Sequence, residues 1–193
     1  MSKKHSKYAL NLINQLTLEE KIALVAGHNF MYTNEVPRLG IPSIRMSDGP
    51  HGLRIQGIDE AGVNAVSSAT CFPTAATTSN SWNPELLEKM GKAMAEEARF
   101  YGIDIILGPG VNIKRNPLCG RNFEYFSEDP LLAGVLGAAE VKGIQSEGVG
   151  TSLKHFAFNN EEDHRYMCDA VVDMRAAHDI YLKPFEYIIT KPS

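Results

Sequence analysis

Cysteine is scarce in this chain. Cys71, Cys119 and Cys168 are an odd number of thiols, and they lie far apart in the sequence. None of them belongs to the closely spaced pairs that zinc sites and redox-active dithiols use. We therefore expect reduced thiols and a cytoplasmic protein.

Long apolar runs and a strong charge of either sign are also missing. No stretch approaches the roughly 18 apolar residues of a membrane span, and the polar start, MSKKHSKYALNLINQL, shows no export signal. The net charge is −4, from 23 acidic and 19 basic side chains. The basic ones are scattered and form no stripe of the kind that binds a nucleic-acid backbone. We expect no membrane and no nucleic acid as partner.

Motifs for nucleotides and metals are absent as well. No Gly-x-Gly-x-x-Gly follows a predicted strand, and there is no Walker loop and no His-Glu-x-x-His. The sequence therefore predicts no cofactor and no metal ion.

Helix signals are clear at four places. Thr17-Leu-Glu-Glu20 matches a capping box and predicts a short helix that ends near Gly27. Asn83-Pro84 and Asp129-Pro130 each combine a polar cap with proline at the first helical position, and each opens a longer helix. A last helix is predicted over residues 173–190, with a proline disturbing its middle.

Short apolar runs at residues 43–47, 103–107 and 151–154 predict strands between these helices. Alternating helices and strands indicate an α/β fold with a parallel sheet. Polar clusters follow the predicted strands, as they do on the active-site face of a (β/α) barrel. A doubly wound sheet also binds ligands beyond its strand ends, so this placement alone leaves both architectures open. The absence of nucleotide motifs disfavours the nucleotide-binding version.

Each polar cluster has an ordinary explanation when it is taken singly, as a turn or a solvated surface. The segment CGRNFEYFSEDP, which begins at Cys119, is harder to explain, because it mixes arginine, carboxylates and three aromatic rings. Polar side chains of these types bind sugar hydroxyls, while aromatic faces pack on the C–H face of a sugar ring. Three such clusters on one face indicate a small polyhydroxylated ligand.

Taken in order, these segments resemble motifs of glycoside hydrolase family 3, of the β-glucosidase type. They are Ser47-Asp-Gly-Pro-His-Gly-Leu-Arg54, Gly120-Arg-Asn-Phe-Glu-Tyr-Phe-Ser-Glu-Asp-Pro130 and Lys154-His-Phe-Ala-Phe-Asn-Asn-Glu-Glu162, and Tyr181-Leu-Lys-Pro-Phe-Glu186 extends the match. The resemblance covers almost the whole chain from Thr17 onward. It implies that residues 1–193 are the N-terminal portion of a catalytic barrel, an α/β fold forming a partial (β/α)8 TIM-like barrel.

The resemblance also implies a substrate site, with a β-glucoside or a short β-linked oligosaccharide as partner. Its expected residues are Asp48, Arg54, Arg121, Lys154, His155 and Arg165. Asp48 would accept hydrogen bonds from the outer sugar hydroxyls, and Arg54 would lie beside it and keep its carboxylate charged. The remaining four would donate to ring hydroxyls or complete the wall. Glu161 and Glu162 are left open, with pairing to neighbouring arginines as one role.

The family's catalytic pair is not matched. Family members are retaining enzymes, with an aspartate nucleophile in a Ser-Asp-Trp-like segment and an acid/base residue further along. The only tryptophan here is Trp82, and no such segment occurs. A (β/α)8 barrel takes about 250 residues, so we expect a truncated chain that is inactive alone. Open barrel edges would favour self-association.

Two other functions stay open. One is a non-catalytic or degenerate sugar-binding module, and the other is chemistry by a carboxylate of this chain, such as Asp48 or Glu124. The pairing of Asp48 with Arg54 favours glucosides, but the residue types also permit xylosides, galactosides and glucosaminides.

Overall fold

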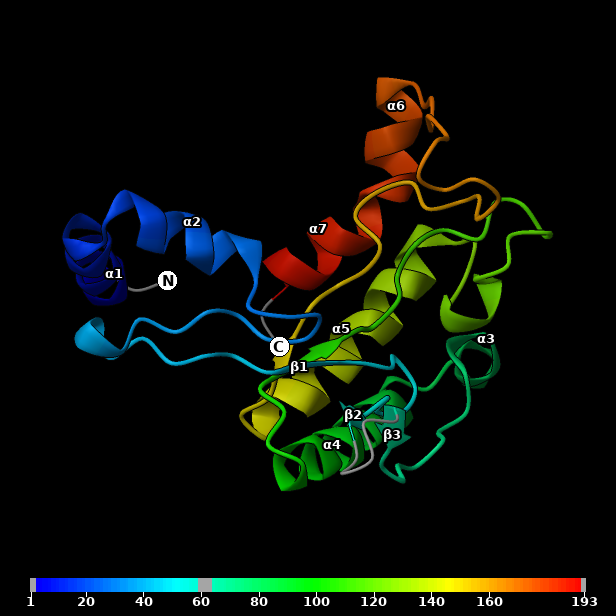
Figure 1. The fold of residues 1–193 in the computed structure, drawn as a ribbon. Coiled ribbons are helices and arrows are strands. Elements are labelled where there is room, and N and C mark those ends of the chain that lie inside the picture. Colours follow the sequence, from blue (N-terminus) through cyan, green and yellow to red (C-terminus); the bar gives the residue numbers. More distant parts are fainter. Residues whose placement is uncertain (1–2, 59–63, 192–193) are drawn as a thin grey trace. The chain divides into compact units, whose positions relative to one another are not determined.

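The structure is a computed structural model that describes residues 3–58 and 64–191 (Figure 1). The chain divides into two compact units, Met1–Met46 and Ser47–Ser193, and each is described by itself. Within the described ranges, no helix has the length and apolar character that crossing a membrane requires.

The first unit contains helices α1 (Lys3–Gln15) and α2 (Leu18–Ala26) and a short 3-10 turn, η1 (Pro37–Leu39). The predicted capping box at the start of α2 is confirmed. The Glu20 amide donates to Thr17 Oγ1 at 3.2 Å, and the Thr17 amide donates to Glu20 Oε2 at 2.8 Å. Helix α1 was not predicted from the sequence.

The second unit is built on a three-stranded sheet of order β1-β4-β5, formed by β1 (Met46–Asp48), β4 (Ile105–Leu107) and β5 (Gly150–Thr151). Strands β4 and β5 pair in parallel, as predicted, with Ile105 opposite Gly150. The observed strands are shorter than predicted, and β1 begins later than the predicted run. A separate antiparallel pair, β2 (Gln56–Ile58) with β3 (Asn64–Val66), was not predicted.

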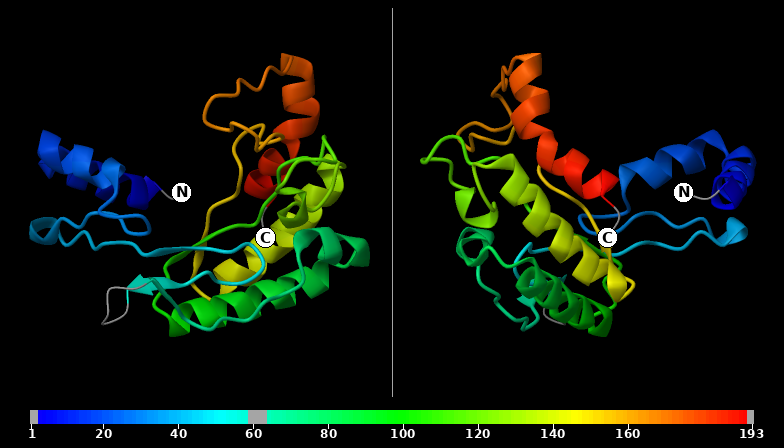
Figure 2. Two further views of the ribbon diagram at one scale, coloured as in Figure 1. Left: turned by 45° about the vertical axis from the view of Figure 1, so that its right-hand side comes forward. Right: turned by 180° about the vertical axis from the view of Figure 1, so that it is seen from behind.

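Two long helices, α4 (Pro84–Phe100) and α5 (Pro130–Ser146), pack closely against each other (Figure 2). Both predicted caps are confirmed: Asn83 Oδ1 accepts from the Leu86 amide at 3.1 Å, and Asp129 Oδ1 accepts from the Leu132 amide at 2.6 Å. The close approach requires glycine, because a Cβ at position 143 would lie 2.1 Å from the Glu88 carbonyl oxygen. The core lies between these helices and β4. Its fully buried members include Leu87, Met94, Ile106, Leu136 and Ile144.

Shorter elements connect the rest of the unit. They are α3 (Ala75–Thr78), η2 (Ser79–Ser81) and η3 (Asn122–Glu124). The predicted last helix is divided into α6 (Met174–Ala176), a π-helical turn η4 (Ala177–Tyr181) and α7 (Lys183–Thr190). The predicted disturbance by proline is confirmed, because the helix is divided and a new helix, α7, begins just before Pro184. In the first turn of α7 the missing N–H of Pro184 leaves no hydrogen bond unmade.

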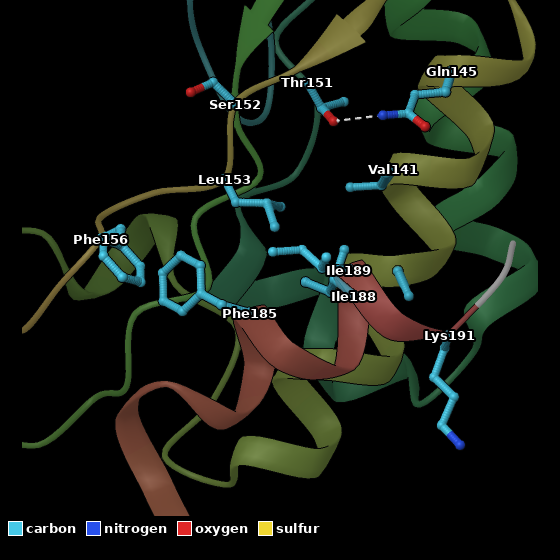
Figure 3. Close-up of a pocket in the computed structure, with 11 residues that line it drawn as sticks. Val141, Gln145, Thr151, Ser152, Leu153, Phe156, Phe185, Ile188, Ile189 and Lys191 are labelled. Carbon is cyan, nitrogen blue, oxygen red and sulfur yellow. Dashed lines mark hydrogen bonds between the residues drawn. The ribbon is translucent and has the colours of Figure 1, made fainter. Parts of the chain in front are cut away.

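An apolar groove opens beside the edge of β5. The amides of Gly150 and Ser152 donate to the carbonyls of Asp104 and Ile106, at 2.7 and 2.9 Å. The backbone N–H and C=O of the intervening Thr151 therefore point to the opposite edge of β5. Residues of α5, α7 and the end of β5 surround a cavity of about 620 Å³ there (Figure 3). Its wall includes Phe156 and Ile189, each 75% exposed. This groove contains none of the six predicted site residues.

Helix α5 buries an acidic side chain. Glu140 is 1% exposed, and its Oε1 has no hydrogen-bond partner among the residues that the structure describes. Burial raises the pKa of the Glu140 carboxyl to about 8. The folded chain therefore holds this proton to a higher pH than the unfolded chain does.

We predict that Glu140 makes stability depend on pH. Between the usual glutamate pKa and about 8, the folded state binds more protons than the unfolded state, so the free energy of unfolding falls as the pH rises. Glu140→Gln removes this titration and should flatten the slope. Urea unfolding at about pH 5 and about pH 8 measures it.

The exposed Glu128→Gln variant is the control for this slope. It should keep the slope of the unmodified chain. Equal slopes in the Glu140→Gln variant and the unmodified chain would contradict the account of Glu140.

Candidate sugar-binding site

Gly110 brings three segments of the chain together at the strand ends. It forms parallel bridges with both Tyr125 and Lys154, and the Val111 amide donates to the Lys154 carbonyl at 2.7 Å. A Cβ at position 110 would lie 2.5 Å from the Glu124 carbonyl oxygen. Only glycine permits this approach, so the Gly-Pro-Gly segment after β4 has a packing role beyond that of a turn.

The Lys154 ammonium lies between two carboxylates. Its Nζ donates to Asp48 Oδ1 at 2.7 Å and lies 3.2 Å from Glu124 Oε2. The Lys154 and Glu124 side chains are only 11% and 4% exposed. Arg121 Nε pairs with the second oxygen of Glu124. One set of ion pairs thus joins the last residue of β1 to residues that follow β4 and β5.

These ion pairs control the charge on Asp48. Burial alone would raise the pKa of the Asp48 carboxyl, but the hydrogen bond and positive charge of Lys154 outweigh it, and the pKa is lowered. Asp48 is therefore ionised near neutral pH. Its carboxylate retains acceptor capacity for a ligand, because Lys154 occupies only one of its oxygens.

The predicted partnership of Asp48 and Arg54 is partly wrong. The two residues are neighbours, since the Arg54 amide donates to the Asp48 carbonyl at 2.8 Å. The ion-pair partner of the Asp48 carboxylate, however, is Lys154. Local spacing suggested Arg54, whereas the parallel sheet brings in a lysine that lies 106 residues away.

Two cavities adjoin the ion pairs. Four of the six predicted residues line the first, of about 460 Å³, and they are Asp48, Arg54, Arg121 and Arg165. His155 lines the second, of about 570 Å³, and Arg165 lines both. The six predicted residues therefore gather in one region, with Lys154 bonded to the wall of the first cavity. Volumes in this range suit small organic ligands.

His51 and Phe123 also line the first cavity and were not predicted as site residues. Their rings meet edge to face, with centroids 5.7 Å apart. Burial lowers the pKa of the His51 imidazole. Both lie inside the motifs noted in the sequence, but residue type alone did not separate them from their neighbours.

His155 is held by a tyrosine that the sequence did not single out. Tyr125 is completely buried, and its hydroxyl lies 2.7 Å from His155 Nδ1. Asn159 Nδ2 donates to the same hydroxyl at 2.8 Å. Burial, together with the positive charges of Arg121 and Lys154, lowers the pKa of the His155 imidazole to about 4. The ring is therefore neutral near pH 7.

The open question about the two glutamates is answered differently for each. Glu162 Oε2 accepts from Arg165 Nη1 at 2.9 Å, and Glu162 Oε1 lies 3.8 Å from Arg121 Nη1. The pairing with arginines is thus confirmed for Glu162. Glu161 instead accepts from the amides of Glu162 and Asp163, at 3.1 and 3.2 Å, and so stabilises the turn.

The arrangement offers hydrogen-bond donors and acceptors and an aromatic wall. Its carboxylates Asp48, Glu124 and Glu162 are all engaged in ion pairs. No cluster of three or more metal-ligating side chains is found in the part of the chain that the structure describes. Charged groups that are held in fixed positions by ion pairs can form directed hydrogen bonds with the hydroxyls of a polar ligand.

Parallel strands that alternate with helices, with an ion-paired cluster at the strand ends, define an α/β protein with a candidate site at the C-terminal edge of its sheet. A comparison with protein families is more specific. The family model described as "Glycosyl hydrolase family 3 N terminal domain" matches residues 20–193 of this chain. The chain belongs to glycoside hydrolase family 3.

Similar proteins agree with this assignment. Thermostable beta-glucosidase B of Acetivibrio thermocellus is 54% identical over 182 residues, which are 93% of this chain and 24% of that protein. Exo-alpha-(1->6)-L-arabinopyranosidase of Bifidobacterium longum is 53% identical over the same length, with the same coverage of each chain. The chain thus spans about a quarter of the length of these relatives.

A solved structure confirms the fold class. Beta-glucosidase 3B from Thermotoga neapolitana, in complex with alpha-D-glucose, superposes with a TM-score of 0.86 at 45% identity, over 95% of this chain and 28% of that chain. The predicted α/β class and partial (β/α)8 barrel are therefore confirmed.

We predict that Lys154→Met destabilises the chain by about 3 to 5 kcal/mol, because it leaves the buried Glu124 carboxylate and the partly buried Asp48 carboxylate without their shared cation. Lys154→Met combined with Glu124→Gln should recover part of the loss. The free energy of unfolding in urea measures both effects.

Lys142→Met is the matched control, since Lys142 pairs with Glu88 at 3.1 Å but is 49% exposed. It should cost less than about 1 kcal/mol. Equal losses for the Lys154 and Lys142 variants would show that the buried pairs have no special weight.

Proposed function

We propose that this chain forms the sugar-binding part of a β-glucosidase-type pocket. In that pocket it would hold the non-reducing-end sugar of a β-glucoside or a short β-linked oligosaccharide. The observation that carries the proposal is the Lys154 ammonium held between Asp48 and Glu124 beside an open cavity. The β-glucosidase relative and the glucose-bound structure support this choice of sugar.

Asp48 is the group on which recognition depends in this proposal. It is ionised, it keeps free acceptor capacity, and its side chain is 34% exposed, so a ligand can reach it. A carboxylate accepting from two adjacent hydroxyls makes charge-assisted bonds, which are about twice as strong as neutral ones. Arg121 and Arg165 complete the donor set around the cavity.

The activity of the whole protein would be hydrolysis of an O-glycosidic bond by a retaining mechanism. That mechanism needs a nucleophile and an acid about 5 to 5.5 Å apart. Glu124 is a poor candidate for either role, because it is buried and its two oxygens pair with Arg121 and Lys154. We therefore infer that the residues of this cluster bind the sugar and that the catalytic pair is not among them.

A pentose substrate is the second candidate. The arabinopyranosidase relative is 53% identical, against 54% for the β-glucosidase, so overall identity does not separate the two. L-Arabinopyranose lacks the exocyclic hydroxymethyl group of glucose. A pocket that binds this group should prefer a glucoside, and one that leaves no room for it should prefer an arabinopyranoside or a xyloside.

Calorimetric titration of the folded chain with glucose tests the proposal. We expect a saturable heat, and Asp48→Asn should weaken the affinity by about tenfold or more, because it removes charge-assisted acceptors. Asp179→Asn, at an exposed position on η4, should leave the affinity unchanged. Titration with methyl β-glucoside, methyl β-xyloside and methyl α-L-arabinopyranoside ranks the candidate sugars.

Circular dichroism confirms that each variant is folded, and sorbitol serves as an open-chain polyol control. A folded chain that gives no saturable heat with any of the three glycosides would remove the sugar-binding proposal. An equal response to sorbitol would show binding of polyols without recognition of a ring.

A further inference from the structure

We infer that Glu162, Asn159 and Tyr125 act as a chain of positioning residues that holds the proton of His155 on Nε2. In this form His155 is a neutral donor toward the sugar. The inference rests on the proposed function for its ligand, but the position of the proton can be measured without any sugar.

The first link orients the Asn159 amide. Asn159 Nδ2 lies 2.8 Å from Glu162 Oε1, and a carboxylate can only accept, so the amide must turn its NH₂ group toward it. Arg165 and Arg121 keep Glu162 charged: burial would raise the pKa of the Glu162 carboxyl, but its hydrogen bonds and these arginines lower it. The alternative orientation of the amide would place two oxygens against each other.

The backbone of Asn159 is fixed independently. Asn112 is buried, and its Oδ1 accepts from the Asn159 amide at 3.0 Å, while its Nδ2 donates to the Asn159 carbonyl, also at 3.0 Å. This reciprocal pair holds residue 159 in place whatever its side chain does. The side-chain amide can therefore be changed with little effect on the backbone.

The second link sets the direction of the Tyr125 hydroxyl. Its oxygen accepts the second hydrogen of Asn159 Nδ2 at 2.8 Å. The hydroxyl hydrogen of a buried tyrosine needs an acceptor. Among the described residues, His155 Nδ1, at 2.7 Å, is the only remaining hydrogen-bond partner of this hydroxyl. Burial raises the pKa of the Tyr125 phenol, so this hydrogen is retained.

The third link follows from the imidazole ring. A neutral imidazole has one donor nitrogen and one acceptor nitrogen. If Nδ1 accepts from Tyr125, Nε2 carries the hydrogen. Residues 155 and 165 line the same cavity, and a sugar hydroxyl there could accept from Nε2–H. The histidine would then recognise an oxygen lone pair without adding a positive charge beside Arg121 and Lys154.

Nitrogen NMR of the full chain near neutral pH tests the tautomer directly. Two-bond proton–nitrogen correlations distinguish a protonated Nε2 from a protonated Nδ1, and a His155→Gln variant assigns the signals among the six histidines. We expect Nε2 protonated and Nδ1 unprotonated. A proton on Nδ1 in the unmodified chain overturns the inference.

Asn159→Asp is the decisive variant. Aspartate cannot donate to the Tyr125 hydroxyl, so the hydroxyl should donate to it, and Nδ1 of His155 should then carry a hydrogen and donate to the tyrosine oxygen. A merely structural role for Asn159 would not move this proton. An unchanged tautomer in a folded Asn159→Asp chain would refute the proposed relay.

Tyr125→Phe is the second variant, in case Asn159→Asp does not fold. It should leave both tautomers populated and weaken glucose binding by about two- to tenfold. Tyr187→Phe, on α7, should change neither quantity. A single Nε2–H tautomer in Tyr125→Phe would overturn the role of Tyr125. Absence of glucose binding in the unmodified chain would count against the proposed function and leave the tautomer result standing.

Discussion

The Lys154 ammonium between Asp48 and Glu124 is the interaction on which the described site depends. It joins the end of β1, the loop after β4 and the residues that follow β5. A carboxylate buried without a partner is strongly destabilising, and the shared cation offsets part of the cost of desolvating Glu124 and Asp48. The position of Gly110 makes the contact geometrically possible, because no side chain separates the Glu124 backbone from the end of the sheet.

A second layer of hydrogen bonds supports this cluster. Glu162 pairs with Arg121 and Arg165, and through Asn159 and Tyr125 it reaches His155. Every side chain in this layer has a partner in fixed geometry, so little ordering remains to be done when a ligand binds. Rigid donors and acceptors of this kind suit a ligand whose hydroxyls differ only in position and orientation. The fold and the proposed function therefore agree.

Local signals allowed much of the fold to be predicted from the sequence. The capping box at Thr17 and the caps at Asn83 and Asp129 are short-range interactions, and each was confirmed with its hydrogen bond. The six predicted site residues come from ordered motifs, and the structure gathers them in one region. The partner of Asp48 could not be predicted from spacing, because Lys154 reaches it only through the parallel sheet. The role of Tyr125 was missed for a related reason: a buried tyrosine hydroxyl shows its purpose only when its partners are known.

A crystal structure of the chain grown with glucose would test whether the Lys154 ion pairs hold Asp48 ready for a sugar. We expect sugar hydroxyls within hydrogen-bonding distance of the Asp48 carboxylate and of His155 Nε2, with the Lys154 ion pairs intact. Glucose bound instead in the apolar groove between α5 and α7, or bound with Lys154 displaced from Asp48, would contradict it.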